Sequence, residues 1–374
     1  MTIYSELRIA STSDVHLGHP KTSAKHIAAN YMAAFPHNAK TAALDILIIA
    51  GDFFDHLLNF PNEDVPEIIS LIVYILRLCK KYDIELMVLE GTPSHDRKQS
   101  KNFVEFNERL AIGCSLSYVD DLEVRIFPKL GISVLFVPDE WSDSADKTLG
   151  ACYDAIATKG LSKVDYAVMH GQFEYQLPPV VKAQKHNSDA YLSLVDKLIF
   201  IGHVHQFSRK DRIIAQGSFD RYSHGDEKPK GHVRAIVRSN DDYEIEFIEN
   251  AGAKIFKTVD CRDMALEDAH KVINKVAIEL VEQSYIRVMA KAGDAILNAT
   301  AHYEKDYPHL QWDFVVKKDA ADAVMKDIAV PQDEYVPVAI TRDNISRMVE
   351  DSLLAKGLTN DVVLRAMQKL KELT

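Results

Sequence analysis

Residues 45–56 read DILIIAGDFFDH, and this stretch decides the expected fold. The apolar run over residues 45–50 is typical of a strand that is buried on both faces, as in a parallel sheet. The run ends in Gly51-Asp52, a glycine followed by a carboxylate. Open α/β sheets bind ligands beyond the carboxyl ends of their strands, so this arrangement predicts a site at the end of a buried strand.

The same pattern recurs through the first 250 residues. Further buried strands are predicted at Leu7–Ser11, Ile84–Leu89, Ile132–Val137, Tyr166–Met169 and Leu198–Ile201. Helical spacing between them predicts helices at Glu67–Tyr82, Lys101–Ile112 and Ala145–Lys159. Residues 206–249 read as antiparallel strands joined by turns. Alternating strands and helices with a strand-rich end predict a layered α/β domain over residues 1–250.

The remainder of the chain has a different organisation. The pattern restarts after residue 250 as β-α-β-α-β, which predicts a small α+β domain over residues 251–327. Residues 328–340 contain two prolines and read as an extended linker. Residues 341–374 then give two short amphipathic helices, which either fold back on the protein or bind a partner.

Composition excludes several classes of protein. The 374 residues are 47% hydrophobic and 26% charged, which is ordinary for a globular protein and unlike a disordered or collagen-like chain. The longest apolar run, Ile68 to Leu76, is too short to span a bilayer, and no signal-peptide pattern is evident, so a cytoplasmic location without membrane contact is expected. The four cysteines lie far apart and are expected to be free thiols. A net charge of −11 argues against nucleic-acid binding by bulk charge alone.

Candidate metal ligands follow five of the predicted strands. They are Asp14-Val-His16, Gly51-Asp52, Ser94-His95-Asp96, His170 and Gly202-His203-Val-His205. The carboxyl ends of parallel strands meet at one edge, so we expect these side chains to converge. A mixture of imidazole and carboxylate suits manganese, iron or zinc and not calcium. Each motif alone is more often a turn or a core residue, but five in order indicate a metal site.

In this order the motifs resemble those of the calcineurin-like metallophosphoesterases, and most of all the SbcD-type nuclease subunit that processes DNA double-strand breaks. Residues 14–19, DVHLGH, resemble the first motif of that branch, and residues 217–231 resemble its GS…R…GE…KG segment. The motif resemblance covers residues 8–235 and rests on layout alone beyond residue 250. It implies a four-layer α/β/β/α sandwich with a small α+β cap domain and a C-terminal helical tail.

The resemblance also implies two divalent metal ions, with Mn²⁺ expected and Mg²⁺ as the alternative. One ion would be held by Asp14, His16, Asp52 and His205, and the other by Asp52, His170, His203 and a third-motif ligand. Two such ions activate a water for attack on phosphorus and neutralise charge on the phosphoryl oxygens. His95 would then protonate the departing 3′ oxygen, with Asp96 orienting its ring.

The second and third motifs depart from the pattern. Where the resembled proteins have an asparagine before the catalytic histidine, this chain has Ser94, and Thr92 follows Gly91. A serine hydroxyl is a shorter and poorer ligand than an amide oxygen, so a looser second ion or one completed by water is expected. Some nucleases place a histidine where Asp55 stands here, and the adjacent His56 is a candidate for phosphate contact.

DNA-binding candidates lie around the predicted centre and are His19, His56, Arg97 and Arg221. The implied function is that of a manganese-dependent DNA exonuclease and endonuclease, the nuclease subunit of an SbcCD-like repair and recombination complex. The implied partners are DNA, a coiled-coil ABC ATPase of SbcC type and a second copy of the chain. No GxxxxGK[ST] motif occurs, so the partner would supply the ATP-binding site.

Two other functions stay open at this point. The first is hydrolysis of a small nucleotide or signalling phosphodiester on the same fold, and the second is a non-enzymatic scaffold that recruits the ATPase. The compact length and the altered third motif favour a divergent member, such as a phage recombination nuclease subunit. The expected location is then the bacterial cytoplasm, or the host cytoplasm for a viral protein.

Overall fold

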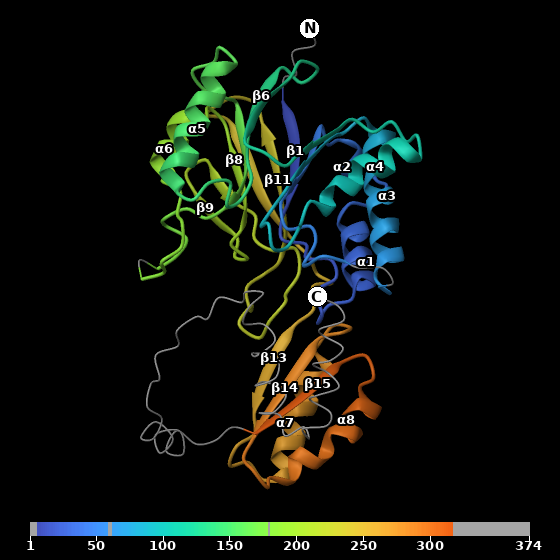
Figure 1. Ribbon diagram of the computed structural model, residues 1–374. Helices are drawn as coiled ribbons and strands as arrows, with labels where there is room; N and C mark the ends of the chain where they lie inside the picture. Colours follow the sequence, from blue (N-terminus) through green and yellow to red (C-terminus); the bar gives the residue numbers. More distant parts are fainter. Residues whose placement is uncertain (1–5, 59–61, 179, 317–374) are drawn as a thin grey trace, which may run out of the picture. The chain divides into compact units, whose positions relative to one another are not determined.

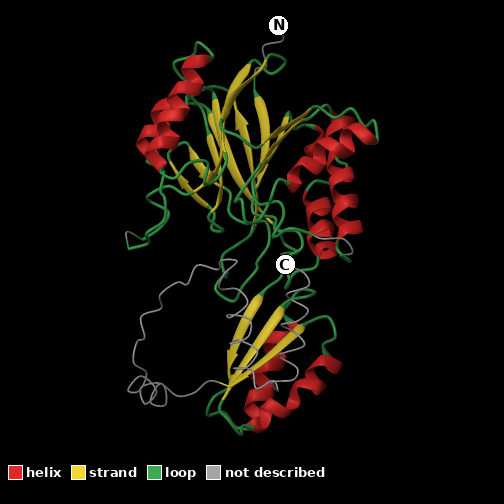
Figure 2. Ribbon diagram, in the orientation of Figure 1, coloured by secondary structure: helices red, strands yellow, loops and turns green. Residues whose placement is uncertain are grey.

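The structure, a computed structural model, describes residues 6–58, 62–178 and 180–316. Within them the chain has a mixed α/β fold with two six-stranded sheets and a three-stranded sheet (Figures 1 and 2). This confirms the α/β class expected from the alternation of strands and helices. The described residues all belong to one compact unit. The predicted linker 328–340 and the predicted helices of 341–374 lie outside the described residues.

The first sheet contains the apolar run of residues 45–50 as one of its central strands. Its order is β12-β11-β1-β2-β3-β4, in which β1 to β4 are parallel and β11 and β12 are antiparallel additions beside β1. The carboxyl ends of β1, β2 and β3 therefore meet at one edge. The strands are β1 (Leu7–Thr12), β2 (Ile46–Ala50), β3 (Glu85–Leu89), β4 (Leu116–Val119), β11 (Gly231–Val237) and β12 (Tyr243–Glu249).

The second sheet has the order β5-β6-β7-β8-β10-β9. Strands β6, β7, β8 and β10 are parallel, and β5 and β9 are antiparallel at the two edges. The parallel run again brings the carboxyl ends of β6, β7 and β8 together. The strands are β5 (Glu123–Phe127), β6 (Ile132–Val137), β7 (Tyr166–Gly171), β8 (Ile199–His203), β9 (Ser208–Lys210) and β10 (Ile213–Ala215).

Three apolar clusters hold these sheets and their helices together. One cluster joins residues of both sheets, including Ile48, Phe136 and Phe200. A second packs the other face of β2, for example Ile49, against α1 and α3, and a third packs β6 to β8 against α5 and α6. The helices lie outside the strands in Figure 2. They are α1 (Ala24–Ala34), α2 (Ala39–Ala42), α3 (Val65–Tyr82), α4 (Asn102–Arg109) after the 3₁₀ turn η1 (Gln99–Lys101), α5 (Ala145–Thr158) and α6 (Ser188–Leu194).

Residues 256–316 form a separate sheet with its own core. Three parallel strands, in the order β13-β14-β15, pack against helices through residues such as Ile273, Ile286 and Tyr303. The order of elements agrees with the predicted β-α-β-α-β pattern, although the second helix of that pattern divides into a 3₁₀ turn and an α-helix. The elements are β13 (Phe256–Asp260), α7 (Leu266–Ile278), β14 (Tyr285–Ala290), η2 (Ala295–Ala299), α8 (Thr300–Asp306) and β15 (Gln311–Val316).

Two further expectations bear on the whole of the described chain. Each helix in the described ranges is too short or too polar to cross a membrane. All four cysteines are buried and none forms a disulfide, as their spacing predicted.

Candidate metal centre

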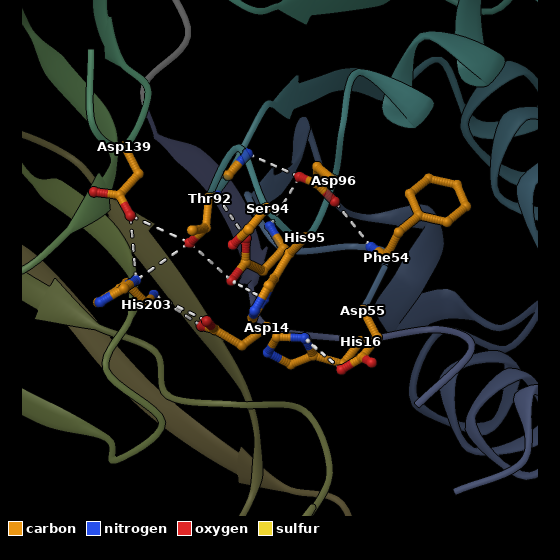
Figure 3. Close-up of polar contacts among 12 residues, drawn as sticks. Asp14, His16, Phe54, Asp55, Thr92, Ser94, His95, Asp96, Asp139 and His203 are labelled. Atoms are coloured by element: carbon orange, nitrogen blue, oxygen red, sulfur yellow. Dashed lines mark hydrogen bonds and ion pairs between the residues drawn. The ribbon is translucent and has the colours of Figure 1, made fainter. Parts of the chain in front are cut away.

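The predicted ligands come together at the carboxyl ends of the strands. Asp14 and His16 follow β1, Asp52 follows β2, His95 follows β3, His170 lies in β7, and His203 and His205 lie at and after the end of β8. Their donor atoms form three groups in which all atoms lie within 4.8 Å of one another: Asp14–His16–His205, His16–Asp52–His95 and Asp52–His170–His203. Figure 3 shows part of this arrangement. These buried aspartate and histidine clusters have the donor chemistry of a site for divalent ions.

The first group presents two imidazole nitrogens and a carboxylate to one point. His16 Nε2 lies 3.1 Å from His205 Nε2, which is 3.8 Å from Asp14 Oδ1. His16 Nδ1 faces Asp55 Oδ1 at 3.5 Å, without a hydrogen bond between them. Burial lowers the pKa of His16 to about 4, so the ring is neutral near pH 7 and able to bind a metal ion.

His170 gives the clearest sign that a cation belongs in the polar network. Its Nδ1 lies 2.7 Å from the carbonyl oxygen of Ala50 and therefore carries the proton that it donates. Its Nε2 lies 3.3 Å from Asp52 Oδ2, but it is buried and has no hydrogen-bond partner among the described residues. Burial alone would lower the pKa of His170, but the carboxylates of Asp52, Asp14 and Asp139 raise it well above the usual value, so a proton on Nε2 is favoured when no cation is present. A metal ion would take the place of that proton, because an Nδ1 fixed by a backbone carbonyl with Nε2 directed at the site is how histidine binds metal ions.

Asp52 lies between the groups and can serve both. Its Oδ2 is 3.0 Å from His95 Nδ1 and 3.3 Å from His170 Nε2, and its Oδ1 accepts the backbone N–H of Thr92 at 2.6 Å. Burial alone would raise the pKa of Asp52, but His170 and His95 hold it well below the usual value. The hydrogen bond to Asp52 in turn raises the pKa of His95. Asp52 is thus an ionised carboxylate that belongs to two of the three groups of donor atoms.

The backbone at the ligands adopts an unusual conformation. Asp14, His16, Asp52 and His203 have φ angles of 50°, 48°, 49° and 96°. Residues other than glycine rarely take this left-handed region, and such strain clusters at functional sites. Hydrogen bonds hold it in place, because the N–H groups of Val15 and His16 both donate to the Asp52 carbonyl oxygen, at 2.8 and 3.1 Å. The loops are therefore fixed in a shape that turns successive side chains toward one point.

Two glycines leave room for the buried His170 ring. Gly51 has φ +82°, and a Cβ atom there would overlap the ring. A Cβ atom on Gly202 would lie 2.6 Å from Ser13 Cβ and 2.8 Å from His170 Nδ1, and it would overlap the Ala50 carbonyl oxygen. Both positions require close approach of the backbone to the ring, which only glycine allows.

The third motif differs in detail from the sequence prediction. Ser94, the predicted ligand, is exposed, and its carbonyl oxygen accepts a hydrogen bond from Arg97 Nε at 3.2 Å. Thr92, in contrast, is buried, and its hydroxyl lies 3.2 Å from Asp52 Oδ2. Thr92 therefore contacts the Asp52 carboxylate, as His95 does, and a metal-binding role for Ser94 stays a prediction.

Sequence reasoning also missed Asp139. This residue follows β6 and places its Oδ2 3.3 Å from His203 Nδ1 and 3.2 Å from the Thr92 hydroxyl. The signal was present, because Asp139 comes directly after a buried parallel strand, as the predicted ligands do. It stands there without a neighbouring histidine or glycine, so no motif drew attention to it.

Asp96 has a different role from the expected one. Its carboxylate accepts backbone N–H groups from Asp52 at 3.0 Å, Phe54 at 2.9 Å and Gly91 at 2.8 Å. The His95 ring instead contacts Asp52. Because Asp96 is fully buried beneath two loops, its oxygens satisfy amides that have no water to bond. Asp96 therefore joins the second and third motifs and does not orient the His95 ring.

The DNA-binding candidates lie in varied surroundings. The His19 ring packs against Tyr222 with their centroids 4.9 Å apart, and His56 and Arg97 are exposed. The Arg221 guanidinium donates to backbone carbonyl oxygens of the segment after β12, at 3.3 and 3.4 Å. Contact of these residues with DNA stays a prediction.

The segment 217–231 supports the last metal loop. Lys230 is buried, donates from Nζ to the His205 carbonyl oxygen at 2.6 Å and forms an ion pair with Asp226. The N–H of Ser218 donates to the same carbonyl oxygen at 3.2 Å. Lys230 and Ser218 therefore fix the backbone of His205, a candidate ligand, through its carbonyl oxygen.

Comparison with known proteins gives only distant likenesses. No protein family matches the sequence, and no curated protein matches it. Similar solved structures include TT1561 of Thermus thermophilus, with 11% identity over 64% of this chain and 98% of that one and a TM-score of 0.38. Another is GAP50, the anchor in the inner membrane complex of Plasmodium, with 12% identity over 66% of this chain and 85% of that one and a TM-score of 0.34. Likenesses this distant say nothing about function. Any functional proposal therefore has to rest on the residues of the centre and on their chemistry.

Proposed function

We propose that the protein is a metal-dependent phosphodiester hydrolase that uses two divalent ions to cleave DNA, with the four-layer sandwich and cap of a metallophosphoesterase. The observation that carries the proposal is the buried His170 Nε2, which has no hydrogen-bond partner in the described chain and faces the ionised Asp52 at 3.3 Å. Histidine and aspartate donors around it come from both six-stranded sheets. This donor set fits Mn²⁺, and Mg²⁺ is the alternative.

The side chains divide into two ligand sets that share one carboxylate. Asp14, His16 and His205 would hold one ion, and His170 and His203 the other, with Asp52 common to both. When bound, such a pair supplies Lewis acidity toward the phosphoryl oxygens and an activated water as nucleophile. The chain itself supplies fixed donor directions, because the loops are held by backbone hydrogen bonds and by buried Asp96.

His95 is the candidate for proton transfer to the leaving group. Its Nδ1 is held at 3.0 Å by Asp52, while its side chain is 38% exposed and can meet a substrate. An imidazole anchored at one nitrogen and open at the other can donate a proton to a departing 3′ oxygen, a step worth roughly 10²–10⁴ in rate.

DNA is the proposed substrate on the strength of the SbcD-like segments 14–19 and 217–231. The resemblance also leads us to propose an SbcC-type ATPase partner and a nuclease dimer. The partner would bring the ATP site that this sequence does not show. Co-expression with candidate coiled-coil ATPases, with and without residues 341–374, tests this part: loss of co-purification on removing the tail supports it, and retention contradicts tail-mediated binding.

The activity is tested by stripping the purified protein of metal with a chelator and adding Mn²⁺ back. Linear duplex DNA, bis(p-nitrophenyl) phosphate and cyclic nucleotides are supplied as substrates. We expect Mn²⁺-dependent cleavage of DNA, abolished in Asp52→Ala and retained in the exposed control Asp241→Ala. Cleavage of the small esters alone would favour the small-molecule phosphodiesterase, and binding of Mn²⁺ without cleavage of any substrate would favour the scaffold.

A further inference from the structure

We propose that Asp139 and Thr92 complete the second ion site, at the place where the resembled nucleases use an asparagine. The inference rests on the proposed function only in that both use the same pair of ions. It assigns a ligand from the end of β6 that none of the expected motifs contains, and it moves the third-motif contribution from Ser94 to Thr92.

The geometry around His203 carries the proposal. Asp139 Oδ2 lies 3.3 Å from His203 Nδ1 and 3.2 Å from Thr92 Oγ1. Thr92 Oγ1 lies in turn 3.2 Å from Asp52 Oδ2 and 3.4 Å from His203 Nδ1. Figure 3 shows Thr92, His203 and Asp139 directed toward one another. The Asp139 side chain is only 14% exposed. Asp139, His203 and Thr92 thus lie close together beside the Asp52 carboxylate.

The hydroxyl of Thr92 cannot satisfy both of its carboxylate neighbours. It has a single hydrogen, yet it lies 3.2 Å from an oxygen of Asp52 and 3.2 Å from an oxygen of Asp139. Whichever carboxylate accepts that hydrogen, the other faces a lone pair. A cation among these oxygens removes the conflict, because both carboxylates and the hydroxyl oxygen then point lone pairs at positive charge.

A second, independent observation points to the same volume. His170 Nε2 is fully buried, is 3.3 Å from Asp52 Oδ2 and has no hydrogen-bond partner in the described residues. His170 and His203 belong to one group of donor atoms within 4.8 Å of one another, together with Asp52. Asp139 is not a member of that group of donor atoms; it approaches the group through His203 Nδ1, and Thr92 approaches it through Asp52 Oδ2.

The fold explains how Asp139 reaches the site. Strand β6 is the parallel neighbour of β7, which carries His170, so their carboxyl ends lie side by side. Asp139 Oδ1 accepts the backbone N–H of Glu140 at 2.9 Å, which orients the carboxylate. Gly171 leaves space for it, since a Cβ atom there would lie 3.2 Å from Asp139 Oδ1.

A carboxylate in place of a neutral amide changes the character of the second site. It adds one negative charge near two divalent ions and so offsets part of their mutual repulsion. Carboxylate and hydroxyl oxygens favour Mn²⁺ and Mg²⁺ over softer ions such as Zn²⁺. Asp139, from a different strand, therefore compensates for the missing asparagine, and binding of the second ion is not weakened.

The test measures Mn²⁺ binding to the full chain by calorimetry and by electron paramagnetic resonance, without DNA. We expect two equivalents and a spin-coupled pair in the wild type. Asp139→Ala should weaken one equivalent at least tenfold and replace the coupled signal with that of a single ion, and Asp139→Asn should have a smaller effect. Thr92→Val should weaken the same equivalent. Asp143→Ala, an exposed residue of the same loop, is the matched control and should bind as the wild type does.

Three outcomes overturn the inference. They are unchanged binding of both equivalents in folded Asp139→Ala and Thr92→Val, loss of the second equivalent in Ser94→Ala, and a wild type that binds one ion. Circular dichroism checks folding, and Asp139→Asn, which keeps the shape of the side chain, decides if the alanine variant is unfolded. A wild type that binds a coupled pair through Asp139 but leaves DNA intact would refute the proposed function and leave this assignment standing.

Discussion

Lys230→Met tests whether Lys230, which is not a candidate ligand, stabilises the backbone of the candidate metal centre. The Lys230 side chain is buried and donates to the His205 carbonyl oxygen at 2.6 Å while it pairs with Asp226. Methionine keeps the length of the side chain up to the ε position and removes the ammonium group with its charge and its donors. The variant therefore isolates the electrostatic contribution from the packing contribution.

The magnitude follows from the two interactions that methionine cannot make. A hydrogen bond from a charged donor contributes roughly 1.5–3 kcal/mol, and removing one partner of a buried ion pair costs roughly 3–5 kcal/mol. The Asp226 side chain is 16% exposed and regains some water, and Ser218 still donates to the carbonyl of His205. We expect the free energy of unfolding to fall by about 3 kcal/mol. Because the His205 backbone is then held less firmly, Mn²⁺ affinity should fall about 10–100-fold.

Urea unfolding and Mn²⁺ titration of the same preparation measure both effects. Lys228→Met, an exposed residue of the same segment, is the control and should change neither quantity. Adding Asp226→Asn to Lys230→Met should recover part of the lost stability, because the carboxylate no longer lacks a counter-ion. Unchanged stability and unchanged Mn²⁺ affinity in Lys230→Met would refute the reasoning.

The same structure makes three other predictions. His95→Ala should keep both Mn²⁺ equivalents and slow DNA cleavage about 10²–10⁴-fold in single-turnover assays, whereas loss of an equivalent would make His95 a ligand. Gly202→Ala should lower the melting temperature and Mn²⁺ affinity because its Cβ meets backbone and a buried ring, while Gly150→Ala, with open space around it in α5, should raise stability by about 0.5–1 kcal/mol. Burial lowers the pKa of His232 to about 3, so between about pH 6.5 and 3 the unfolded chain binds a proton that the folded chain does not. Stability should therefore decrease as the pH is lowered from about 6.5 to about 3. Urea unfolding across this range should show a weaker pH dependence in His232→Phe and no change in the exposed His309→Phe.

The buried strands were the most predictable part of the fold. Strand β6 has the predicted bounds, Ile132–Val137, because a parallel strand covered on both faces needs an uninterrupted apolar run. Helix α1 was not predicted, although its buried residues Ala24, Ile27, Ala28 and Tyr31 have helical spacing. The partners of β10 were also beyond the local pattern, since it pairs antiparallel with β9 but parallel with β8. The sequence of a strand predicts how deeply the strand is buried, but not which strands it pairs with.

The centre was predictable where a ligand is tied to the end of a strand. His170 and Asp52 could be placed together because parallel strands bring their ends to one edge. Thr92 and Ser94 could not be told apart, because the direction of a side chain within a loop depends on hydrogen bonds such as that from Thr92 N–H to Asp52. The role of Asp96 was misread for a related reason: which buried amides lack a partner is set by tertiary contacts.

The candidate ligands are divided between two sheets that are joined through apolar packing. Asp14 and Asp52 come from the first sheet, and His170 and His203 from the second. Ions held by both sets would link the two sheets, and the distance between the ions would change with any shift of one sheet relative to the other. A conservative substitution in the shared core, such as at Phe200, would then lower the catalytic rate without contacting a candidate ligand. The catalytic rate would therefore report how the two sheets pack against each other.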